Sequence, residues 1–530
     1  MQKVLTAEQM REVDRLTTER YGIPSILLME NAAHAVASVI TEKLGGSVKG
    51  KSILILCGKG NNGGDGAAIA RILKSEGANV KVIIFAKVEQ TKGDARANFE
   101  RLQNVAKLFE AEEWYKAWEY IDREDWDNLS CVVDAVFGTG LRGFRDDLNE
   151  IIGGFQGTFH VAVDIPSGLS ADESAVQPFQ YSADITVTFA APKPANILPP
   201  ASNFNGELLV ANIGSPQELI DEQPSQLYLA DRKDVTKWLE STAFSSSDYK
   251  NKRGHALLVA GSENYSGAAV MCGNSAMRSG VGLVTLCVPE SCKAEIASRC
   301  LPELIVRTFG GSPEAIDAAD AIAVGCGLSA TDGDVEKLVR SIIEQRKMPV
   351  IIDAGALWFF NPHKGPLTEA ENHPVGEAPP PLLGKEGSLP PLILTPHEGE
   401  FMRLLGTDDK EAIKDRVAAV RDFAVKNKVI LVLKGERVLI GCPDGRVVVN
   451  PTGNSGLGKA GNGDTLTGIL TGFVAQAVRF EIDIFETVVA AVYVAGMAGD
   501  IAEKKYGKRV MTASDVRECL TDVFAGFEEK

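Results

Sequence analysis

Three segments of the chain place an acidic side chain beside a glycine-rich turn. They are GKGNNGGDG at 58–66, VVDAVFGTGLRGF at 132–144 and VAVDIPSGL at 161–169. Taken singly, each Asp has the alternative role of a helix cap or turn residue. Because all three segments follow or end an apolar, strand-like run, their side chains should meet where parallel strands end, and oxygen ligands of this kind suit a hard cation. The residues expected to converge are Asn62, Asp65, Asp134, Asp164 and Ser167.

The first of these segments begins with the pattern GxGxxG of dinucleotide-binding turns. Lys87 stands where such proteins place an acidic residue for the ribose. The segment also carries two Asn and one Asp, which a pyrophosphate turn does not need. We therefore expect it to bind its ligand through side chains as well as through the backbone.

In the second half, GNGD at 461–464 precedes a long helical pattern. Gly461 and Gly463 let the backbone approach an anion, and the free N–H groups of a helix start stabilise developing negative charge. Asp464 could then act as a base, and its alternative role is to cap the helix. The overlapping GxxxxGKA run ends at Ala460 instead of Ser or Thr, so we reject a P-loop.

Three further segments of the second half carry polar groups after apolar runs. VAGSENYSGAAVMCG at 259–273 is a second candidate anion cradle, and LVLKGERV at 431–438 brings Lys434 to the end of a strand. TPHEGEF at 395–401 places His397 there as well. A structural histidine and a solvated lysine are the alternatives for these two.

Short apolar runs alternate with helical patterns along the chain, which predicts an α/β protein. The runs in the first half are 52–57, 80–86, 131–137, 159–164 and 184–189. Those in the second half are 255–261, 281–288, 320–325, 349–355, 392–396 and 429–435. The pattern loosens between the two series, so we place domains at 1–230 and 231–530. Residues 361–391 are rich in Pro and Gly and predict a surface insertion without a catalytic role.

Composition narrows the class of partner and the compartment. The net charge of −16 argues against a broad nucleic-acid surface. The sequence shows no apolar leader and no run of about 18 apolar residues, so we expect no membrane partner. Nine Cys residues are scattered without a CxxC pair, which argues against a disulfide framework and favours a reducing compartment. We expect a cytoplasmic protein.

The first half resembles the NAD(P)H-hydrate epimerase (YjeF N-terminal) domain over residues 5–215. The resemblance rests on YGIPSILLMENA, CGKGNNGGDG, VVDAVFGTGLRG and VDIPSGL, in that order. It implies a Rossmann-like, doubly wound sheet that interconverts the R and S hydrates at C6 of the nicotinamide ring. It also implies that K⁺ is bound by Asn62, Asp134 and Ser167, and that Asp164 contacts the substrate as acid or base. The other implied substrate-binding residues are Asn61, Asn62, Gly63, Gly64, Asp65, Gly138, Thr139, Gly140, Leu141, Arg142, Gly143 and Phe144.

The second half resembles the ADP/ATP-dependent NAD(P)H-hydrate dehydratase (YjeF C-terminal, ribokinase-like) domain over residues 240–525. GSENYSGAA, VGCGLS, IIDAGAL, LTPHEGEF, LKG and GNGDTLTG carry this resemblance. It implies phosphoryl transfer from ADP or ATP, with Mg²⁺, to the hydroxyl of the S hydrate, followed by elimination with Asp464 as base. The implied hydrate-binding residues are Ala268, Gly327, His397 and Asp464, and those for the nucleotide are Lys434, Gly435, Glu436, Arg437, Val438, Asn462 and Gly463. The chain departs from the family pattern at Asn462, Val438 and Gly355.

These features favour a fused metabolite-repair enzyme acting on hydrated NADH and NADPH (NADHX and NADPHX). A ribokinase-type small-molecule kinase with an N-terminal specificity domain is the alternative, and a nucleotide-binding sensor without activity is a third. We expect a homo-oligomer with small-molecule substrates, and the preference between ADP and ATP stays open.

Overall fold

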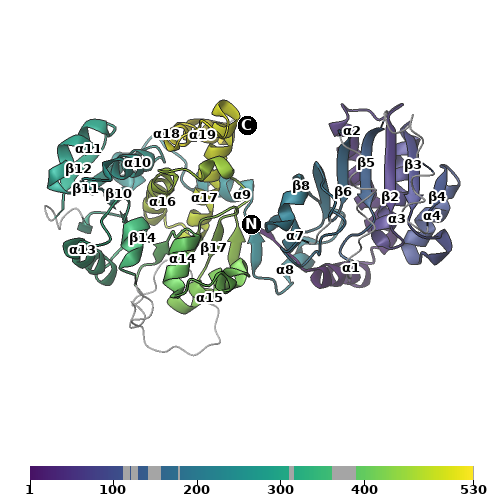
Figure 1. Cartoon of the computed structure of the whole chain (residues 1–530), viewed down its shortest axis with the longest axis horizontal. Coiled ribbons are helices and arrows are strands. Elements are labelled where there is room, and N and C mark those ends of the chain that lie inside the picture. Colours follow the sequence, from purple (N-terminus) through teal and green to yellow (C-terminus); the bar gives the residue numbers. More distant parts are fainter. Residues whose placement is uncertain are drawn as a thin grey trace. The chain divides into compact units, whose positions relative to one another are not determined.

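The computed structural model describes residues 1–111, 120, 129–140, 157–176, 180–309, 316–360 and 389–528. It divides the chain into two compact units, residues 2–225 and residues 226–530 with Met1 (Figure 1). The predicted substrate residues Leu141, Arg142, Gly143 and Phe144 lie outside the described residues, as does most of the 361–391 insertion.

The sheet of the first unit has the strand order β4-β3-β2-β5-β6-β7-β8, and every neighbouring pair is parallel. Its strands are β2 (Ser52–Cys57), β3 (Asn79–Ile84), β4 (Leu108–Glu110), β5 (Leu129–Ala135), β6 (Phe159–Val163), β7 (Ile185–Phe189) and β8 (Glu207–Ala211). The chain winds outward from β2 in one direction and then from β5 in the other. This confirms the doubly wound sheet and puts its switch point between β2 and β5, where such sheets bind ligands.

The helices of this unit cover the sheet because its strands alternate in the direction of their apolar side chains. In β2, Ile53, Ile55 and Cys57 join the main core, whereas Leu54 and Leu56 join a smaller cluster. Helix α3 packs on β2, β3 and β5 and contacts α2 and α4. The helices are α1 (Ala7–Tyr21), α2 (Ser25–Lys43), α3 (Asn61–Ser75), α4 (Gly93–Gln103), α7 (Pro194–Ile197) and α8 (Gln217–Asp221).

Helix α3 begins at Asn61, so NNGGDG forms the first turns of the helix. The glycine-rich sequence instead predicts a loop over these residues, followed by a helix from Ala67. Glycine is required here by close packing. A Cβ atom at Gly63 would lie 1.8 Å from the carbonyl oxygen of Gly58, and one at Gly66 would lie 2.7 Å from Cys57 Sγ. The glycines that suggested a loop therefore let the helix start press against β2 and its turn.

The second unit contains a mixed sheet with the order β9-β18-β17-β16-β15-β14-β13-β10-β11-β12. Only the pairs β16-β17 and β17-β18 of this run are antiparallel. The strands are β9 (Leu227–Leu229), β10 (His255–Val259), β11 (Leu283–Val288), β12 (Ile305–Thr308), β13 (Ala321–Val324), β14 (Val350–Ile352), β15 (Leu392–Leu394), β16 (Ile430–Leu433), β17 (Leu439–Gly441) and β18 (Val447–Val449). All six predicted runs of this half contain a strand of the sheet.

Two long helices form the centre of this unit. Helix α16 packs against α10 and α17, and both long helices contribute many side chains to the main core. Helix α17 is long and apolar enough to span a membrane, but 67% of its most apolar window is buried inside the fold, as in a core helix. The helices are α9 (Arg232–Ser241), α10 (Ser266–Met277), α11 (Lys293–Arg299), α13 (Gly333–Glu344), α14 (Glu398–Leu405), α15 (Arg416–Asn427), α16 (Asn462–Arg479), α17 (Ile484–Tyr506), α18 (Ala513–Glu518) and α19 (Leu520–Glu528).

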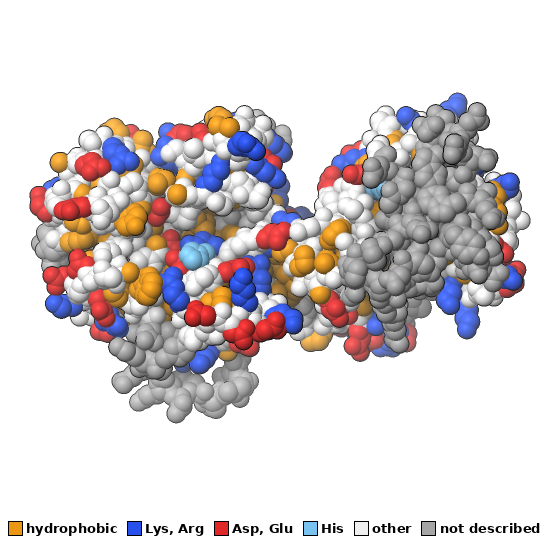
Figure 2. Space-filling model, in the orientation of Figure 1, with side chains coloured by type: hydrophobic (Ala, Val, Ile, Leu, Met, Phe, Trp, Pro, Cys, Tyr) orange, Lys and Arg blue, Asp and Glu red, His pale blue; other side chains and the backbone are white. Residues whose placement is uncertain are grey.

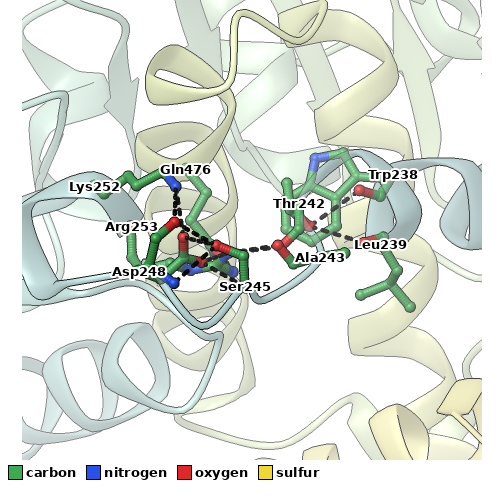
Figure 3. Close-up of polar contacts among 10 residues, drawn as sticks. Trp238, Leu239, Thr242, Ala243, Ser245, Asp248, Lys252, Arg253 and Gln476 are labelled. Carbon is green, nitrogen blue, oxygen red and sulfur yellow. Dashed lines mark hydrogen bonds and ion pairs between the residues drawn. The ribbon is translucent and has the colours of Figure 1, made fainter.

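A buried arginine ties the segment after α9 to the side of α16 (Figure 3). Arg253 donates to the carbonyl oxygen of Thr242 at 2.7 Å and to Gln476 Oε1 at 3.0 Å. It also lies 3.4 Å from Asp248 Oδ2, which offsets its charge. The contacts hold α16 in place, and the first turn of that helix carries Asp464.

Candidate active sites

In the first unit, Asp134 and Ser167 are bonded directly to one another across neighbouring strand ends. The Ser167 hydroxyl donates to Asp134 Oδ1 at 2.6 Å, and the Ser167 N–H donates to Asp134 Oδ2 at 2.7 Å. Burial raises the pKa of Asp134 to about 6, although these hydrogen bonds oppose the rise. Asp134 lies near the end of β5 and Ser167 lies in the loop after the neighbouring strand β6, so adjacent strand ends bring the two residues together.

Asp164 is bound by a lysine that the sequence analysis did not single out. Lys193 Nζ donates to Asp164 Oδ1 at 2.7 Å and to Thr188 Oγ1 at 2.9 Å, and Thr188 Oγ1 donates to the same carboxylate oxygen at 2.9 Å. Lys193 is only 2% exposed. Its position just after an apolar strand, between Pro192 and Pro194, was the available signal. A buried lysine in such a turn needs a carboxylate partner.

The backbone of Asp164 is held in the left-handed region, with φ at 67°. The Asp164 N–H donates to the carbonyl oxygen of Val187 at 2.8 Å, and Asn196 Nδ2 donates to the carbonyl oxygen of Asp164 at 3.3 Å. A non-glycine residue in this region is unfavourable unless its surroundings hold it there. The hydrogen bonds from Lys193 and Thr188 fix the direction of the carboxylate, which is what a reacting group needs.

The other predicted residues of this unit lie around Asp164. A Cβ atom at Gly138 would lie 3.1 Å from Asn62 Oδ1 and 3.2 Å from Asp164 Oδ2, so these three residues are neighbours. Gly138, Thr139 and Gly140 form the turn after β5. In the first turns of α3, Asn61 is exposed, Asn62 is half-buried, and Gly63, Gly64 and Asp65 are buried.

Several polar groups near Asp164 have no protein partner. Asn62 Nδ2 and Asp14 Oδ1 are buried and make no hydrogen bond, and Asp65 makes none with the residues that the structure describes. Burial raises the pKa of Asp65 well above its usual value, with further contributions from Asp164 and Asp14. Buried polar groups in folded proteins are nearly always bonded. This set therefore marks a polar site that a ligand would complete.

In the second unit, the central ionic contact joins Lys434 to Asp353, a residue that the sequence analysis did not name as a site residue. Lys434 Nζ donates to Asp353 Oδ1 at 2.9 Å, and Thr467 Oγ1 donates to Asp353 Oδ2 at 2.8 Å. Burial opposes the charge of Lys434, but Asp353 and Glu400 outweigh it and raise the pKa of the lysine. Asp353 directly follows β14 and Lys434 directly follows β16, two strands on either side of β15.

Asp464 lies in the first turn of α16 beside this pair. Burial, helped by the negative charge of Asp353, raises the pKa of Asp464 to about 6, while Cys326 and Lys434 oppose the rise. A Cβ atom at Gly463 would lie 3.4 Å from Lys434 Nζ and 3.9 Å from Asp353 Oδ2. Gly461 has φ at 90°, so the helix start follows a left-handed turn that glycine adopts readily. The arrangement gathers a carboxylate, a lysine and free helix N–H groups.

The predicted hydrate-binding residues occupy two places around this unit. A Cβ atom at Gly327 would lie 2.9 Å from Ala268 Cβ, so these two residues are neighbours at the start of α10. His397 is the N-cap of α14, where its Nδ1 accepts from the N–H groups of Gly399 and Glu400. It also pairs with Lys434 in an isolated β-bridge. His397 therefore caps α14 and also lies beside Lys434.

The predicted nucleotide-binding residues 434–438 form the connection between β16 and β17. This connection is fixed from both sides. Arg416 Nη2 donates to the carbonyl oxygen of Arg437 at 3.4 Å, and Arg437 donates to that of Pro451. The carbonyl oxygen of Val438 accepts from Asn450 at 2.9 Å. Gly435 and Glu436 are exposed at the tip, open to a ligand.

Two of the departures from the family pattern have a structural account. Asn462 Nδ2 donates to the carbonyl oxygens of Leu457 and Lys459 at 3.0 and 3.3 Å, so its side chain closes the preceding turn. A Cβ atom at Gly355 would lie 2.3 Å from the carbonyl oxygen of Leu328, which leaves no room for a side chain. The carboxylate of this loop that faces Lys434 belongs instead to Asp353. Nothing in the structure explains Val438.

Among the residues that the structure describes, no group of three or more His, Cys, Asp or Glu side chains forms a metal cluster. Mg²⁺ is commonly held by one or two carboxylates together with nucleotide phosphates, and a K⁺ ion accepts neutral oxygen ligands. Asn62, Asp134 and Ser167 all carry oxygen atoms, the type of ligand that hard cations prefer.

Comparison with known proteins assigns both units. Residues 25–195 match the family model of the YjeF-related protein N-terminus, and residues 256–522 match that of NAD(P)H-hydrate dehydratase. The bifunctional NAD(P)H-hydrate repair enzyme Nnr of Moorella thermoacetica is 36% identical over 549 residues, covering 99% of this chain and 97% of that protein. The corresponding enzyme of Thermofilum pendens is 31% identical, with coverage of 99% and 97%.

One solved structure is similar to part of the chain. It is the ADP/ATP-dependent NAD(P)H-hydrate dehydratase from Bacillus subtilis, co-crystallized with ATP/Mg²⁺. It is 30% identical, covers 57% of this chain and 98% of its own, and has a TM-score of 0.47. The full-length relatives and the two domain models establish the family: this chain belongs to the bifunctional NAD(P)H-hydrate repair enzymes, Nnr.

Proposed function

We propose that the chain repairs hydrated NADH and NADPH in two steps, with an epimerase in residues 2–225 and an ADP/ATP-dependent dehydratase in residues 226–530. The observation that carries this proposal is that the chain matches bifunctional repair enzymes along nearly its whole length. An Asp–Lys pair in each unit supports it. Lys193 binds Asp164 in the first unit, and Lys434 binds Asp353 in the second.

In the first unit, Asp164 is the group that exchanges a proton with the hydroxyl at C6 of the hydrate. Opening and reclosing the carbinolamine requires this proton transfer. Lys193 and Thr188 hold the carboxylate of Asp164 fixed in direction. Asn62, Asp134 and Ser167 would hold K⁺, which supplies a fixed positive charge for an anionic substrate. Asp65 and the turn at 138–140 bind the substrate.

In the second unit, Asp464 takes the proton of the S hydrate hydroxyl, and the helix start at Gly463 stabilises the transferred phosphoryl group. Lys434 adds positive charge beside the nucleotide phosphates, and Asp353 fixes its ammonium group. Mg²⁺ would accompany ADP or ATP and neutralise phosphate charge. Elimination of phosphate then returns NAD(P)H.

The kinase alternative is not favoured, because a small-molecule kinase would have no use for the first unit's carboxylate and lysine.

The surface agrees with small-molecule substrates. In the face shown in Figure 2, basic and acidic side chains are mixed among the residues drawn in colour. The nine cysteines form no disulfide, which supports a reducing compartment such as the cytoplasm. We also propose that the protein forms a homo-oligomer, and light scattering of the pure protein would test this by measuring its molar mass.

Two separate assays test the proposal. Without nucleotide, the enzyme should equilibrate pure R hydrate with the S form, as followed by chromatography. With ADP or ATP and Mg²⁺, it should convert pure S hydrate to NADH and phosphate in equal amounts. Phosphorylation of an unrelated small alcohol without NADH formation would instead favour the kinase.

A further inference from the structure

Helix α1 packs over the two loops that carry Asp164 and Lys193. Ala7, at its first turn, packs with Ile165 and Ala195, the neighbours of those two residues along the chain. Farther along α1, Val13 and Leu16 pack with Ala191. Just before the helix, the Leu5 N–H donates to the carbonyl oxygen of Pro192 at 3.0 Å. The helix is therefore fixed in place beside the candidate epimerase site.

Asp14, a half-buried residue in the middle of this helix, has no hydrogen-bond partner for its side chain among the residues that the structure describes. Its Oδ1 atom is buried and makes no hydrogen bond. The acidic residues on the outer side behave differently, since Glu12 and Glu19 both bind Arg15 at the surface. An unpaired buried carboxyl costs stability, so a purely structural Asp would be expected to find a donor. The neighbouring arginine, Arg15, is bound instead to Glu12 and Glu19.

The charged groups that act on Asp14 are those of the site. Lys193 favours its ionised form, and Asp164 disfavours it. Asp65 is close enough for Asp14 to raise its pKa. Lys193 thus acts on both Asp164 and Asp14, while the negative charge of Asp164 disfavours the ionised form of Asp14.

We propose that Asp14 is the second proton-transfer group of the epimerase site, working opposite Asp164. The proposal rests on the epimerase function proposed above for residues 2–225. It assigns a substrate-facing task to a residue of α1, outside the three glycine-rich segments that the sequence analysis identified.

The reaction needs two such groups, and its atoms balance with them. Asp164 removes the proton from the C6 hydroxyl, C6=O forms, and the C6–N1 bond breaks. The electron pair of that bond stays on N1, which takes a proton from Asp14. The aldehyde then rotates so that its opposite face meets N1. N1 attacks C6 and returns its proton to Asp14, while Asp164 returns a proton to the oxygen. Nothing is oxidised, and no atom is gained or lost.

The environment of Asp14 suits an exchangeable proton. Burial raises the pKa of Asp14 to about 6, within reach of neutral pH in both directions. Burial also raises the pKa of Asp65 well above its ordinary value, and Asp164 and Asp14 add to the rise. Groups with a pKa near the working pH transfer protons most effectively.

The test compares Asp14→Asn, Asp14→Glu and the matched surface control Glu12→Gln in the full chain, with nucleotide omitted so that only epimerisation is measured. Asp14→Asn should lower kcat by about 100-fold with KM changed less than about threefold, as expected for loss of acid–base catalysis. Asp14→Glu should keep kcat within about tenfold, and Glu12→Gln should match wild type.

Thermal unfolding separates a catalytic from a structural role. Asn removes an unpaired buried charge, so Asp14→Asn should unfold at the same temperature or higher at pH 7.5. Unchanged epimerisation by Asp14→Asn, or a loss of kcat that parallels a lower Tm and is not restored by Glu, would overturn the inference. If wild type itself does not epimerise the hydrate, the proposed function fails and takes the inference with it.

Discussion

Lys193 and Asp164 form an ion pair of 2.7 Å, with their side chains only 2% and 11% exposed. Replacing Lys193 by Met should leave a buried carboxylate without its partner. We expect epimerisation to fall by at least about 100-fold. We also expect the first unit to lose about 3 kcal/mol of unfolding free energy, measured by urea denaturation.

Lys43→Met is the matched control for this variant, because Lys43 pairs with Glu207 at the surface of the same unit. It should change neither quantity. Equal losses in both variants would show that any lost lysine disturbs the unit, which contradicts a specific role for Lys193. Dehydration of pure S hydrate should survive in both.

The dehydratase should depend on pH through Asp464. A base must be ionised to act, so kcat should be full above the pKa of Asp464, which is about 6, and should fall as the pH drops through that value. Initial rates of NADH formation from pure S hydrate between pH 5 and 8 test this. A rate that rises toward pH 5 would contradict the assignment of Asp464 as base.

The neighbours of Asp464 should move this inflection in opposite directions. Asp353 raises the pKa of Asp464 and Lys434 lowers it. Asp353→Asn should therefore shift the inflection to lower pH, and Lys434→Met should shift it to higher pH. The same pH series measures both variants. Shifts of the same sign would show that these residues affect the rate by a route other than the charge on Asp464.

Arg253 should matter for the stability of the second unit and not for its chemistry. Its guanidinium is buried against Asp248 and Gln476, so Arg253→Met should lower the free energy of unfolding by about 3 kcal/mol. The neighbouring, more exposed Lys252 offers the control variant Lys252→Met, expected to have a much smaller effect. Dehydratase kcat at 25 °C should stay within about twofold in both, and a selective loss of kcat in Arg253→Met would contradict a stabilising role.

Much of the fold could be predicted from the sequence because apolar runs and glycine turns mark local structure. The apolar run at 52–57 forms strand β2 with the same bounds, and strand β16 (430–433) lies within the predicted run at 429–435. The start of α3 was misplaced, since glycine usually favours loops and only the tertiary contacts of Gly63 and Gly66 explain a helix there. Such contacts are not visible in one sequence.

Residues in recognisable motifs, such as Asp164, Asp464 and Lys434, could be singled out from the sequence, but several residues that surround them could not. Asp164 and Asp464 lie in glycine-rich motifs that draw attention to them. Lys193, Asp353 and Asp14 stand in ordinary surroundings and take their roles from pairing or burial across long stretches of chain. A lysine in a strand-end turn or an aspartate in an amphipathic helix is usually solvated, so the pattern alone favours the wrong expectation.

The most direct test of the two-step account follows NADH absorbance in a mixture of R and S NADH hydrates with ATP or ADP, Mg²⁺ and K⁺. Wild type should convert nearly all of the hydrate. Asp464→Asn should convert none, and Asp164→Asn should convert only the S fraction promptly. Complete conversion by Asp164→Asn at the wild-type rate, or no NADH from wild type, would contradict the account.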